Sequence, residues 1–259
     1  MGNSARLGQH FLVDEAARDA VVAAVMPAPG KRVLEIGPGG GVLTEPLLEA
    51  GAAVTAVELD DRLYARLAAR LAPRGLLLMH ADFLTLDLAR LQPGPYTVVA
   101  NLPYAVGTPI LQRLLSWPGW TDAVLMFQKE VALRLCARPG GPDYGVLTLS
   151  TLLWARADYL IDVPNTAFRP RPRVSSGVVR LVRRPQPLVC EARQAAFFRL
   201  AKAAFAQRRK MAAGSLAAAL SRPREQIEAA FVRLGVSVTA RPENIPFEAF
   251  AALTEEFIS

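Results

Sequence analysis

The sequence predicts an α/β fold, in which a Rossmann-like parallel sheet with helices on both faces is followed by a smaller all-helical domain. Three observations predict it. Residues 1–135 alternate short β-branched runs with longer helical patterns, which is typical of parallel sheets. A proline- and glycine-rich break, "ARPGGPDYG" (137–145), comes next. Beyond the linker-like "RRPQP" (183–187), nearly every segment has helical periodicity. We therefore expect a sheet domain at 1–184 and a helical domain at 185–259.

Each expected strand is a short run of apolar or β-branched residues that a polar or glycine-containing segment ends. Five such runs come first: "RVLEI" (32–36), "AVTAVEL" (53–59), "LLLMH" (76–80), "YTVVAN" (96–101) and "AVLMFQ" (123–128). Two more are expected at 156–162 and 176–182. Helices are expected where apolar residues recur every three or four positions, at 14–25, 44–50, 60–71, 107–117, 129–136, 145–154, 191–206, 208–221, 224–234 and 246–257.

Composition excludes several classes of protein. Of the 259 residues 52% are hydrophobic, yet no run approaches the ~18 apolar residues of a membrane span. The first residues lack the pattern of a signal peptide, and Arg6 breaks the myristoylation motif, so we expect a cytoplasmic protein without a membrane partner. Two cysteines (Cys136, Cys190) and two histidines (His10, His80) are too few for a disulfide framework or a metal cluster, so no metal is expected.

Basic residues are concentrated in the second part of the chain. Residues 1–160 carry 14 Lys and Arg against 15 Asp and Glu, whereas residues 161–259 carry 16 against 8. Within 169–210 there are twelve basic side chains and one acid, Glu191. Such clustering favours a polyanionic partner such as nucleic acid. The alternative is an ordinary solvated face of an arginine-rich protein.

A glycine-rich loop follows the first of these strands. "VLEIGPGGGVLTEPLLEAG" (33–51) has the order strand, glycine turn, helix. Gly37, Gly39 and Gly41 have the spacing G-x-G-x-G, and Val42 stands where a dinucleotide-binding loop needs its third glycine. Glycine lets the backbone approach a ligand closely. This version of the loop suits S-adenosylmethionine, which carries no pyrophosphate. A tight turn that binds nothing is the alternative.

Two acids follow the next two strands. Glu58 ends the second strand, where a carboxylate can accept hydrogen bonds from both ribose hydroxyls. Asp82 follows the third strand and can accept from an adenine amino group, with Phe83 beside the ring. Each acid alone is equally typical of a solvated strand end. Together they outline an adenosine pocket at the carboxyl edge of the sheet.

The string "NLPY" (101–104) ends the fourth strand next to this pocket. The exocyclic amine of adenine is a weak nucleophile, because its lone pair is delocalised into the ring. Two acceptors aimed at its N–H groups would localise that lone pair: the Asn101 side-chain oxygen and the carbonyl of Leu102 or Pro103. Tyr104 would offer a face for stacking once the base has left its helix. The alternative is a proline turn with a half-buried tyrosine.

Taken in order, these motifs closely resemble those of the KsgA (RsmA) family of small-subunit ribosomal RNA adenine dimethyltransferases. The matching strings are "GQHFL" (8–12), "EIGPGGGVLT" (35–44), Glu58, "ADFL" (81–84), "NLPY" (101–104), "GTPI" (107–110), "MFQKEVALRL" (126–135), "YGVLTL" (144–149), "VPNTAFRPRPRVSSGVVRL" (163–181) and "FAQRRKMAAGSL" (205–216).

The resemblance implies a seven-stranded methyltransferase sheet, a helical C-terminal domain and S-adenosylmethionine as the methyl donor. It implies that two methyl groups are added to each of two adjacent adenosines in the 3′-terminal hairpin of 16S rRNA. The implied substrate is a partly assembled small ribosomal subunit, and the enzyme is expected to be a monomer.

The resemblance also implies roles for individual residues. The residues that would line the cofactor are His10, Leu12, Gly37, Glu58, Asp82 and Asn101. Tyr104 and Phe168 would sandwich the target adenine. The chain departs from the family pattern at His10, where asparagine is usual, at Ala81, where glycine is usual, and at Asn165, which interrupts a usual pair of prolines.

The arginine-rich stretch "FRPRPRV" (168–174) is expected to contact RNA. Its prolines keep the chain extended, so that Arg169, Arg171 and Arg173 would reach phosphates beside a flipped base, with Phe168 as the second stacking wall. In the alternative, the loop is solvated and Phe168 is tucked into the core. The basic run Arg208, Arg209 and Lys210 suits either RNA contact or ordinary exposed charge.

Two other functions are consistent with parts of the sequence. A large-subunit rRNA adenine methyltransferase of the macrolide-resistance type shares the glycine loop and a related acceptor motif. The strings "VPNTAFRPRPRV" and "RPENIPFEAF" (241–250) fit the small-subunit family better. A catalytically silent ribosome-assembly or transcription factor would keep the fold and bind RNA, but Glu58, Asp82 and "NLPY" argue against it.

Overall fold

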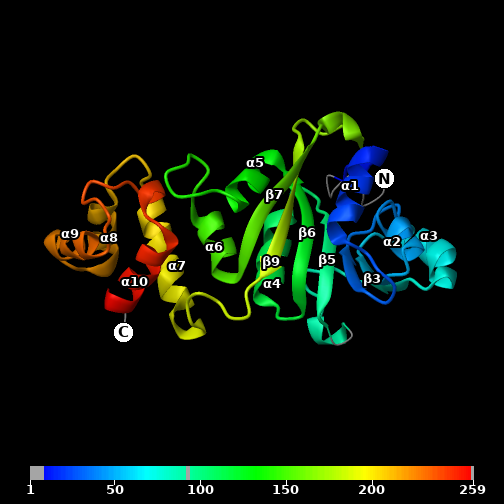
Figure 1. Ribbon diagram of the computed structural model, residues 1–259, viewed down its shortest axis with the longest axis horizontal. Helices are drawn as coiled ribbons and strands as arrows, with labels where there is room; N and C mark the ends of the chain where they lie inside the picture. The colour runs from blue at the N-terminus through cyan, green and yellow to red at the C-terminus, as the bar shows by residue number, and fades with distance from the viewer. Residues whose placement is uncertain (1–8, 92–93, 258–259) are drawn as a thin grey trace. The chain divides into compact units, whose positions relative to one another are not determined.

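The computed structural model describes residues 9–91 and 94–257, so Gly8 of the "GQHFL" string lies outside the described residues. The chain folds into two compact units (Figure 1). The first comprises Met1–Leu133 and Arg156–Arg183, and the second comprises Arg134–Ala155 and Arg184–Ser259. The predicted fold class is confirmed, because the first unit is an α/β sheet unit and the second is helical.

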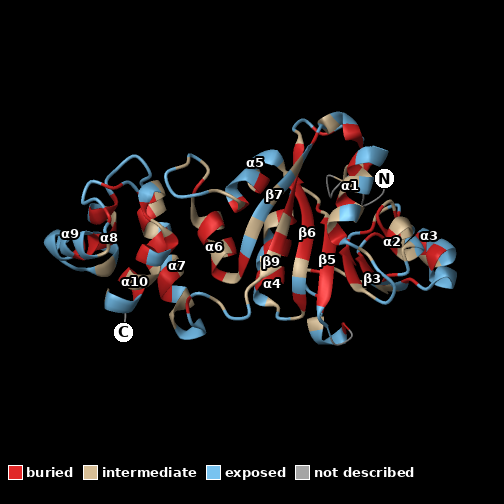
Figure 2. Ribbon diagram, viewed as in Figure 1, coloured by how far each residue is buried: buried red, intermediate tan, exposed pale blue. Residues whose placement is uncertain are grey.

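The first unit is built on a seven-stranded sheet with the order β4-β3-β2-β5-β6-β9-β7. Its strands are β2 (Arg32–Ile36), β3 (Ala53–Glu58), β4 (Leu77–His80), β5 (Tyr96–Asn101), β6 (Trp120–Gln128), β7 (Ala155–Val163) and β9 (Ser176–Arg183). Strands β2 to β6 pair in parallel, and β9 pairs antiparallel with β6. Figure 2 shows β5, in the middle of this order, buried over nearly its whole length. The carboxyl ends of β3, β2 and β5 therefore lie side by side at one edge.

Helices connect these strands at positions close to those expected. They are α1 (Glu15–Val25), α2 (Thr44–Glu49), α3 (Asp61–Leu71), α4 (Gly107–Ser116) and α5 (Lys129–Leu135), with the 3-10 turns η2 (Ala72–Arg74), η3 (Leu88–Arg90) and η4 (Asn165–Ala167). Aspartates start two of them. Asp14 accepts a hydrogen bond from the N–H of Ala17 at 2.8 Å. Asp60 accepts from Arg62 and Leu63 at 2.9 and 3.0 Å. These side chains satisfy amide groups that the helix leaves unpaired at its N-terminus.

A second sheet, which the sequence did not predict, has only two strands. β1 (Phe11–Leu12) pairs antiparallel with β8 (Phe168–Arg169), with Phe11 opposite Arg169 and Leu12 opposite Phe168. Strands of two residues are too short to produce an alternating pattern. This sheet places the N-terminal segment beside a segment from the other end of the sheet unit.

The helical unit contains α6 (Val146–Trp154), α7 (Glu191–Phe205), α8 (Ala212–Leu220), α9 (Arg224–Arg233), α10 (Phe247–Phe257) and the 3-10 turn η5 (Pro242–Asn244). α8 begins at Ala212 and not at residue 208, because residues 206–210 form turns. Leu149 and Leu153 of α6 are fully buried in one core with residues of α7 to α10. Residues 134–155 therefore belong to the helical unit. The sequence analysis expected one domain boundary, after residue 184, whereas the chain passes between the two units after residues 133, 155 and 183.

Substituting Gly177→Ala should destabilise the sheet unit. A methyl group at this position of β9 would lie 2.8 Å from the Cβ of Ala132 and 2.6 Å from the hydroxyl of Tyr159. The Ala132 carbon is fixed to α5 and cannot move away, so we expect a loss of about 1–3 kcal/mol in the free energy of unfolding.

The matched control is Gly214→Ala, at an exposed position of helix α8, where nothing lies within 4 Å of the added methyl. Alanine favours a helix over glycine, so this variant should gain about 0.5–1 kcal/mol. Urea unfolding followed by tryptophan fluorescence measures both changes. Equal stability of the Gly177→Ala variant and the wild type would contradict the crowding seen at β9.

Candidate functional site

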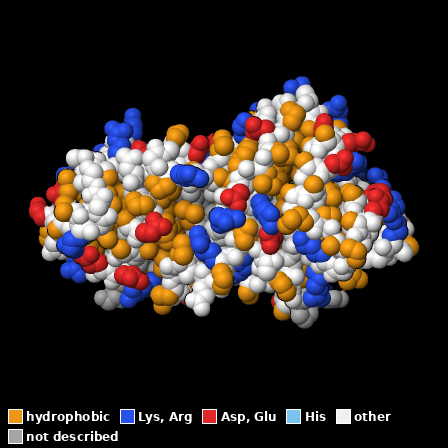
Figure 3. Space-filling model, viewed as in Figure 1, with side chains coloured by type: hydrophobic (Ala, Val, Ile, Leu, Met, Phe, Trp, Pro, Cys, Tyr) orange, Lys and Arg blue, Asp and Glu red, His pale blue; other side chains and the backbone are white. Residues whose placement is uncertain are grey.

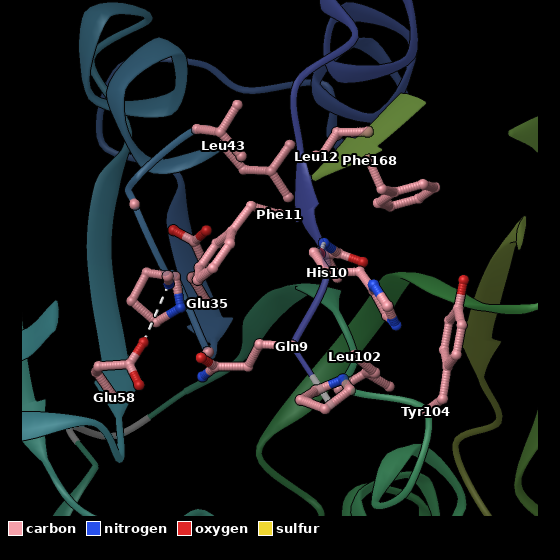
Figure 4. A pocket seen from close by; sticks show the side chains of 17 residues that line it. Gln9, His10, Phe11, Leu12, Glu35, Leu43, Glu58, Leu102, Tyr104 and Phe168 are labelled. Carbon is pink, nitrogen blue, oxygen red and sulfur yellow. Dashed lines mark hydrogen bonds between the residues drawn. The ribbon is translucent and has the colours of Figure 1, made fainter. Parts of the chain in front are cut away.

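A cavity that is open to solvent lies at the carboxyl edge of the sheet. Its lining comes from five parts of the sheet unit: residues 9–12, the loop after β2 with Glu35, the end of β3 at Glu58, residues 101–104, and Phe168 of β8. Figure 4 shows Glu35, Glu58, Gln9 and Phe11 toward one side of this cavity. The side chains of Leu102, Tyr104, His10 and Phe168 lie toward the other side. The cavity therefore has a carboxylate end and an aromatic end.

The glycine loop supplies the backbone of the carboxylate end. Gly37 and Gly39 line the cavity, with φ angles of 68° and 58° that disfavour other residues. Gly41 does not line it. Its φ is 85°, and a Cβ there would lie 2.9 Å from Leu67 and 2.8 Å from Arg70 of α3. The sequence placed Gly41 at the cofactor, whereas the structure places it in the packing between the loop and α3.

Glu58 connects the end of β3 to the glycine loop. Its Oε2 accepts from the N–H of Gly39 at 3.0 Å, and its Oε1 accepts from the N–H of Asp60 at 2.8 Å. Its side chain is only 2% exposed, yet it lines the cavity. Each carboxylate oxygen can accept a second hydrogen bond, so Glu58 can still bind a hydroxyl group in the cavity.

The structure does not bring Asp82 and Phe83 to the cavity lining. Asp82 lies two residues beyond the end of β4, and its Oδ1 accepts from the N–H of Leu84 at 2.8 Å. Phe83 is buried, with 4% of its surface exposed. The two residues predicted to contact the adenine are thus absent from the cavity lining. They nevertheless follow His80 closely in the chain, and His80 is the β4 residue that pairs with the lining residue Glu58.

Glu35 is a lining residue for which the sequence analysis named no role. It is 2% exposed, and its Oε2 accepts a 2.6 Å hydrogen bond from the hydroxyl of Thr44. Burial raises the pKa of Glu35 to about 7, the charge of Glu58 adds to this rise, and the bond from Thr44 opposes it. An acid within an otherwise apolar buried strand, two positions before the first loop glycine, is the signal that could have identified it. Gln9, Phe11 and Leu43 also line the cavity and were not predicted.

The acceptor motif begins at the end of β5. The side-chain amide of Asn101 donates from Nδ2 to the main-chain carbonyl of His10 at 3.1 Å. The carbonyl of Pro103 accepts from the N–H of Val106 at 3.1 Å. That bond uses one of the two lone pairs of the Pro103 carbonyl, so both Leu102 and Pro103 stay candidates for the main-chain acceptor, and Leu102 lines the cavity beside Asn101.

The aromatic end of the cavity is lined by the rings of Tyr104, His10 and Phe168. Tyr104 forms a 2.8 Å hydrogen bond with the hydroxyl of Ser176, and its ring lies 5.5 Å from that of His10. Burial raises the pKa of the Tyr104 phenol, and the hydrogen bond with Ser176 opposes this rise, so the hydroxyl stays neutral at physiological pH. Phe168 is only 1% exposed and belongs to the core of the sheet unit, and it also lines the cavity, so its role as a stacking wall stays a prediction.

The predicted RNA-contacting arginines differ in what they bind within the protein. Arg169 donates to the carbonyl of Phe168 at 2.9 Å. Arg171 donates from Nε and Nη2 to the Asn165 side-chain oxygen at 3.1 and 2.8 Å. Arg173 is exposed. Figure 3 shows Lys and Arg side chains in small groups on the visible face, with acidic and hydrophobic side chains among them.

In the helical unit, the Arg208 side chain contacts other residues of the same unit. Its Nη2 donates to the carbonyls of Pro142 and Tyr144 at 2.8 and 3.1 Å, and its guanidinium lies 5.9 Å from the Phe205 ring. The neighbouring Arg209 and Lys210 are exposed and line a separate hollow of this unit. All three residues of the basic run are therefore exposed, and Arg208 also makes hydrogen bonds to main-chain carbonyls of its own unit.

Within the described residues, no group of three or more His, Cys, Asp or Glu side chains could hold a metal ion. In the same part of the chain, no helix has both the length and the apolar character that crossing a bilayer requires.

Comparison with known proteins gives consistent matches along the chain. A family described as "Ribosomal RNA adenine dimethylase" matches residues 2–258. The protein named "Ribosomal RNA small subunit methyltransferase A" from Magnetococcus marinus is 43% identical to this chain, and the match covers 96% of this chain and 89% of the relative. The protein of that name from Bordetella petrii is 42% identical, covering 98% and 94%.

Two solved structures share the fold over 96% of this chain. A dimethyladenosine transferase from Plasmodium falciparum has a TM-score of 0.82 and 25% identity, with 97% of it covered. The 23S rRNA methyltransferase ErmE has a TM-score of 0.75 and 29% identity, with all of it covered.

Replacing Glu35 with Gln should change how stability depends on pH. The pKa of Glu35 in the folded chain, about 7, lies above its ordinary value of 4.5, so the folded chain retains a proton that the unfolded chain releases. The resulting stabilisation is complete below pH 4.5 and is lost as the pH rises toward about 7. We expect this loss to reach about 3 kcal/mol in the wild type and to be absent in Glu35→Gln, because glutamine does not titrate. Urea unfolding at about pH 5 and about pH 8 checks it. The same pH slope in both proteins would contradict the raised pKa.

Proposed function

Since this chain belongs to the ribosomal RNA adenine dimethylase family and is a small-subunit rRNA adenine dimethyltransferase, we propose that it methylates two adjacent adenosines of the 3′-terminal rRNA hairpin. Each adenosine would receive two methyl groups on its exocyclic amine. The observation that carries the residue-level proposal is the single cavity that joins Glu58 and the glycine loop to Asn101 and Tyr104.

S-adenosylmethionine supplies an electrophilic methyl group on its sulfonium. The residues at the carboxylate end fit such a donor. Gly37 and Gly39 offer backbone without side chains, and a Cβ on Gly39 would come within 3.4 Å of the Phe11 ring, close to the cavity. Glu58 keeps acceptor capacity for ribose hydroxyls. We assign the lining residues Leu12, Gly37, Gly39, Glu58 and Asn101, together with the main chain of His10, to this donor. Asp82 and Phe83 remain candidates for its adenine, from outside the present lining.

Catalysis then requires the target amine to be held with its lone pair facing the sulfonium. The Oδ1 atom of Asn101 and the carbonyl of Leu102 accept from the two N–H groups of the amine and draw its nitrogen toward tetrahedral geometry. Pro103 restricts Leu102 to extended backbone and so helps to aim that carbonyl. These groups act through position and hydrogen-bond electrostatics, without a covalent intermediate.

The base itself is held at the aromatic end. A flipped adenine stacks on Tyr104, whose hydroxyl is fixed by Ser176, and Phe168 forms the opposite wall. Arg169, Arg171 and Arg173 lie directly after Phe168 and are suited to the phosphates beside the flipped nucleotide. Arg208, Arg209 and Lys210 in the helical unit are exposed and are suited to further RNA contacts, although Nη2 of Arg208 already donates to two main-chain carbonyls. The proposed partner is a partly assembled small subunit, met by a cytoplasmic monomer.

The two alternative functions are less well supported. ErmE, a 23S rRNA methyltransferase, is 29% identical to this chain, whereas the proteins named small-subunit methyltransferase A reach 43%. Identity therefore favours the small-subunit substrate. A non-catalytic assembly factor would have no need to keep Asn101, Tyr104 and Glu58 together at one cavity.

The decisive experiment is transfer of labelled methyl from S-adenosylmethionine to unmethylated small subunits, with large subunits as the control. We expect label only in the small subunit, on two adjacent adenosines of the terminal hairpin, where dimethyladenine stops primer extension. Label in the large-subunit RNA would favour the macrolide-resistance type. Cofactor binding without any transfer would favour the silent factor.

Replacing Tyr104 with Ala should slow methyl transfer about tenfold to a thousandfold, because the stacking contribution of ~1–3 kcal/mol is lost and the base is misplaced. Tyr104→Phe keeps the stacking face and loses only the bond with Ser176, so it should stay within a few-fold of the wild type. Single-turnover rates at saturating donor compare the three proteins. An unchanged rate in Tyr104→Ala would remove this residue from the mechanism.

A further inference from the structure

His10 links three segments of the sheet unit that are far apart in the chain. It immediately precedes β1, which pairs with β8. Its ring contacts Pro170, just beyond β8, and its main-chain carbonyl contacts Asn101, at the end of β5. These contacts lie at the aromatic end of the cavity, where Figure 4 shows the His10 ring among Leu102, Tyr104 and Phe168.

The ring contact determines which nitrogen carries the proton. The Nδ1 atom of His10 lies 2.6 Å from the carbonyl oxygen of Pro170. A carbonyl oxygen only accepts hydrogen bonds, so Nδ1 must be the protonated, donating nitrogen. This bond ties the main chain at His10 to the segment that carries Phe168. The β1–β8 pairing at Leu12 and Phe168 reinforces the same tie.

The main-chain contact determines the orientation of the Asn101 amide. The carbonyl of His10 lies 3.1 Å from Nδ2 of Asn101. Only the NH₂ end of an amide can donate to a carbonyl, so this contact selects one of the two ways in which the amide can face. The Oδ1 end is thereby left to accept from a ligand in the cavity that Asn101 lines. With the reverse orientation, the NH₂ group would face the N–H groups of the amine and repel them.

We propose that His10 is a positioning residue for methyl transfer, whose ring anchors the carbonyl that orients the Asn101 amide. The inference rests on the proposed function, because it needs Oδ1 of Asn101 to be the acceptor of the amine N–H. In this inference, the His10 side chain acts at the aromatic end of the cavity, where the target adenine would bind. Only the backbone of His10 is then left to contact the methyl donor. The small β1–β8 sheet then has a role in catalysis, because it holds this carbonyl in place.

Three variants of His10 separate the hydrogen bond from the bulk of the ring. His10→Ala removes both. His10→Phe keeps a ring but has no donor for the carbonyl of Pro170. His10→Asn keeps a donor, because the asparagine Nδ2 is attached to Cγ as the histidine Nδ1 is. Single-turnover transfer to small subunits gives the rate, titration calorimetry gives the dissociation constant of S-adenosylmethionine, and thermal unfolding reports stability.

We expect transfer by His10→Ala and His10→Phe to be about tenfold to a hundredfold slower than by the wild type, since a misplacement of about 1 Å costs about that much. His10→Asn should recover most of the rate. The dissociation constant of the donor should change less than about threefold in all three, because the ring does not bind it. If His10→Ala unfolds, the pair His10→Phe and His10→Asn still tests the hydrogen bond.

A double-mutant cycle tests whether His10 acts through Asn101. If the only task of the His10 ring is to orient that amide, adding His10→Ala to Asn101→Ala should not slow the residual transfer further. If the double variant lost rate by the product of the losses in the two single variants, the inference would be overturned. A His10→Phe variant as fast as the wild type would also overturn it, as would weaker donor binding that accounts for the whole loss of rate. A wild type that does not methylate small subunits would instead refute the proposed function, so the two failures are distinguishable.

Discussion

The site depends on one constraint: parallel strands end at a common edge. Because β3, β2 and β5 are neighbours and all run the same way, the residues at their carboxyl ends converge although they are far apart in the sequence. Glu58 and Asn101 end their strands, and Glu35 lies one residue before the end of β2. The same arrangement buries Glu35 beside Glu58, which is why the pKa of Glu35 is raised. The parallel order of these strands therefore explains both the convergence of the site residues and the raised pKa of Glu35.

The sheet alone supplies only part of the cavity. The rest comes from residues 9–12 and Phe168, which the β1–β8 pairing holds together although they are far apart in the sequence. This cover combines apolar and aromatic side chains with the amide of Gln9 and the imidazole of His10, whereas the strand ends supply acids and an amide. The division suits a reaction between a charged donor and a planar base, because each partner meets the surface that complements it.

Much of this could be predicted from the sequence, because the signals are local. Each main strand is a run of apolar residues, and the glycine spacing and "NLPY" lie within single turns of chain. The surroundings of a side chain could not be predicted where they depend on partners that are distant in the sequence. Gly41 was assigned to the cofactor because it shares a spacing with Gly37 and Gly39, yet Leu67 and Arg70 of α3 occupy its surroundings. Arg208 is exposed like its basic neighbours, and only the structure reveals its hydrogen bond to the carbonyl of Tyr144, which is 64 positions earlier in the chain.

The placement of α6 limits how this enzyme can be divided. Leu149 and Leu153 are buried against residues of the C-terminal helices, although α6 itself precedes β7 and β9 of the sheet. A fragment that stops after residue 184 would keep α6 and lose its core partners, leaving an apolar helix face in water. Exposed apolar surface of this kind promotes aggregation. Removing the C-terminal helices would therefore produce an insoluble fragment and not a minimal methyltransferase, and loss of activity in it would carry no information about RNA binding.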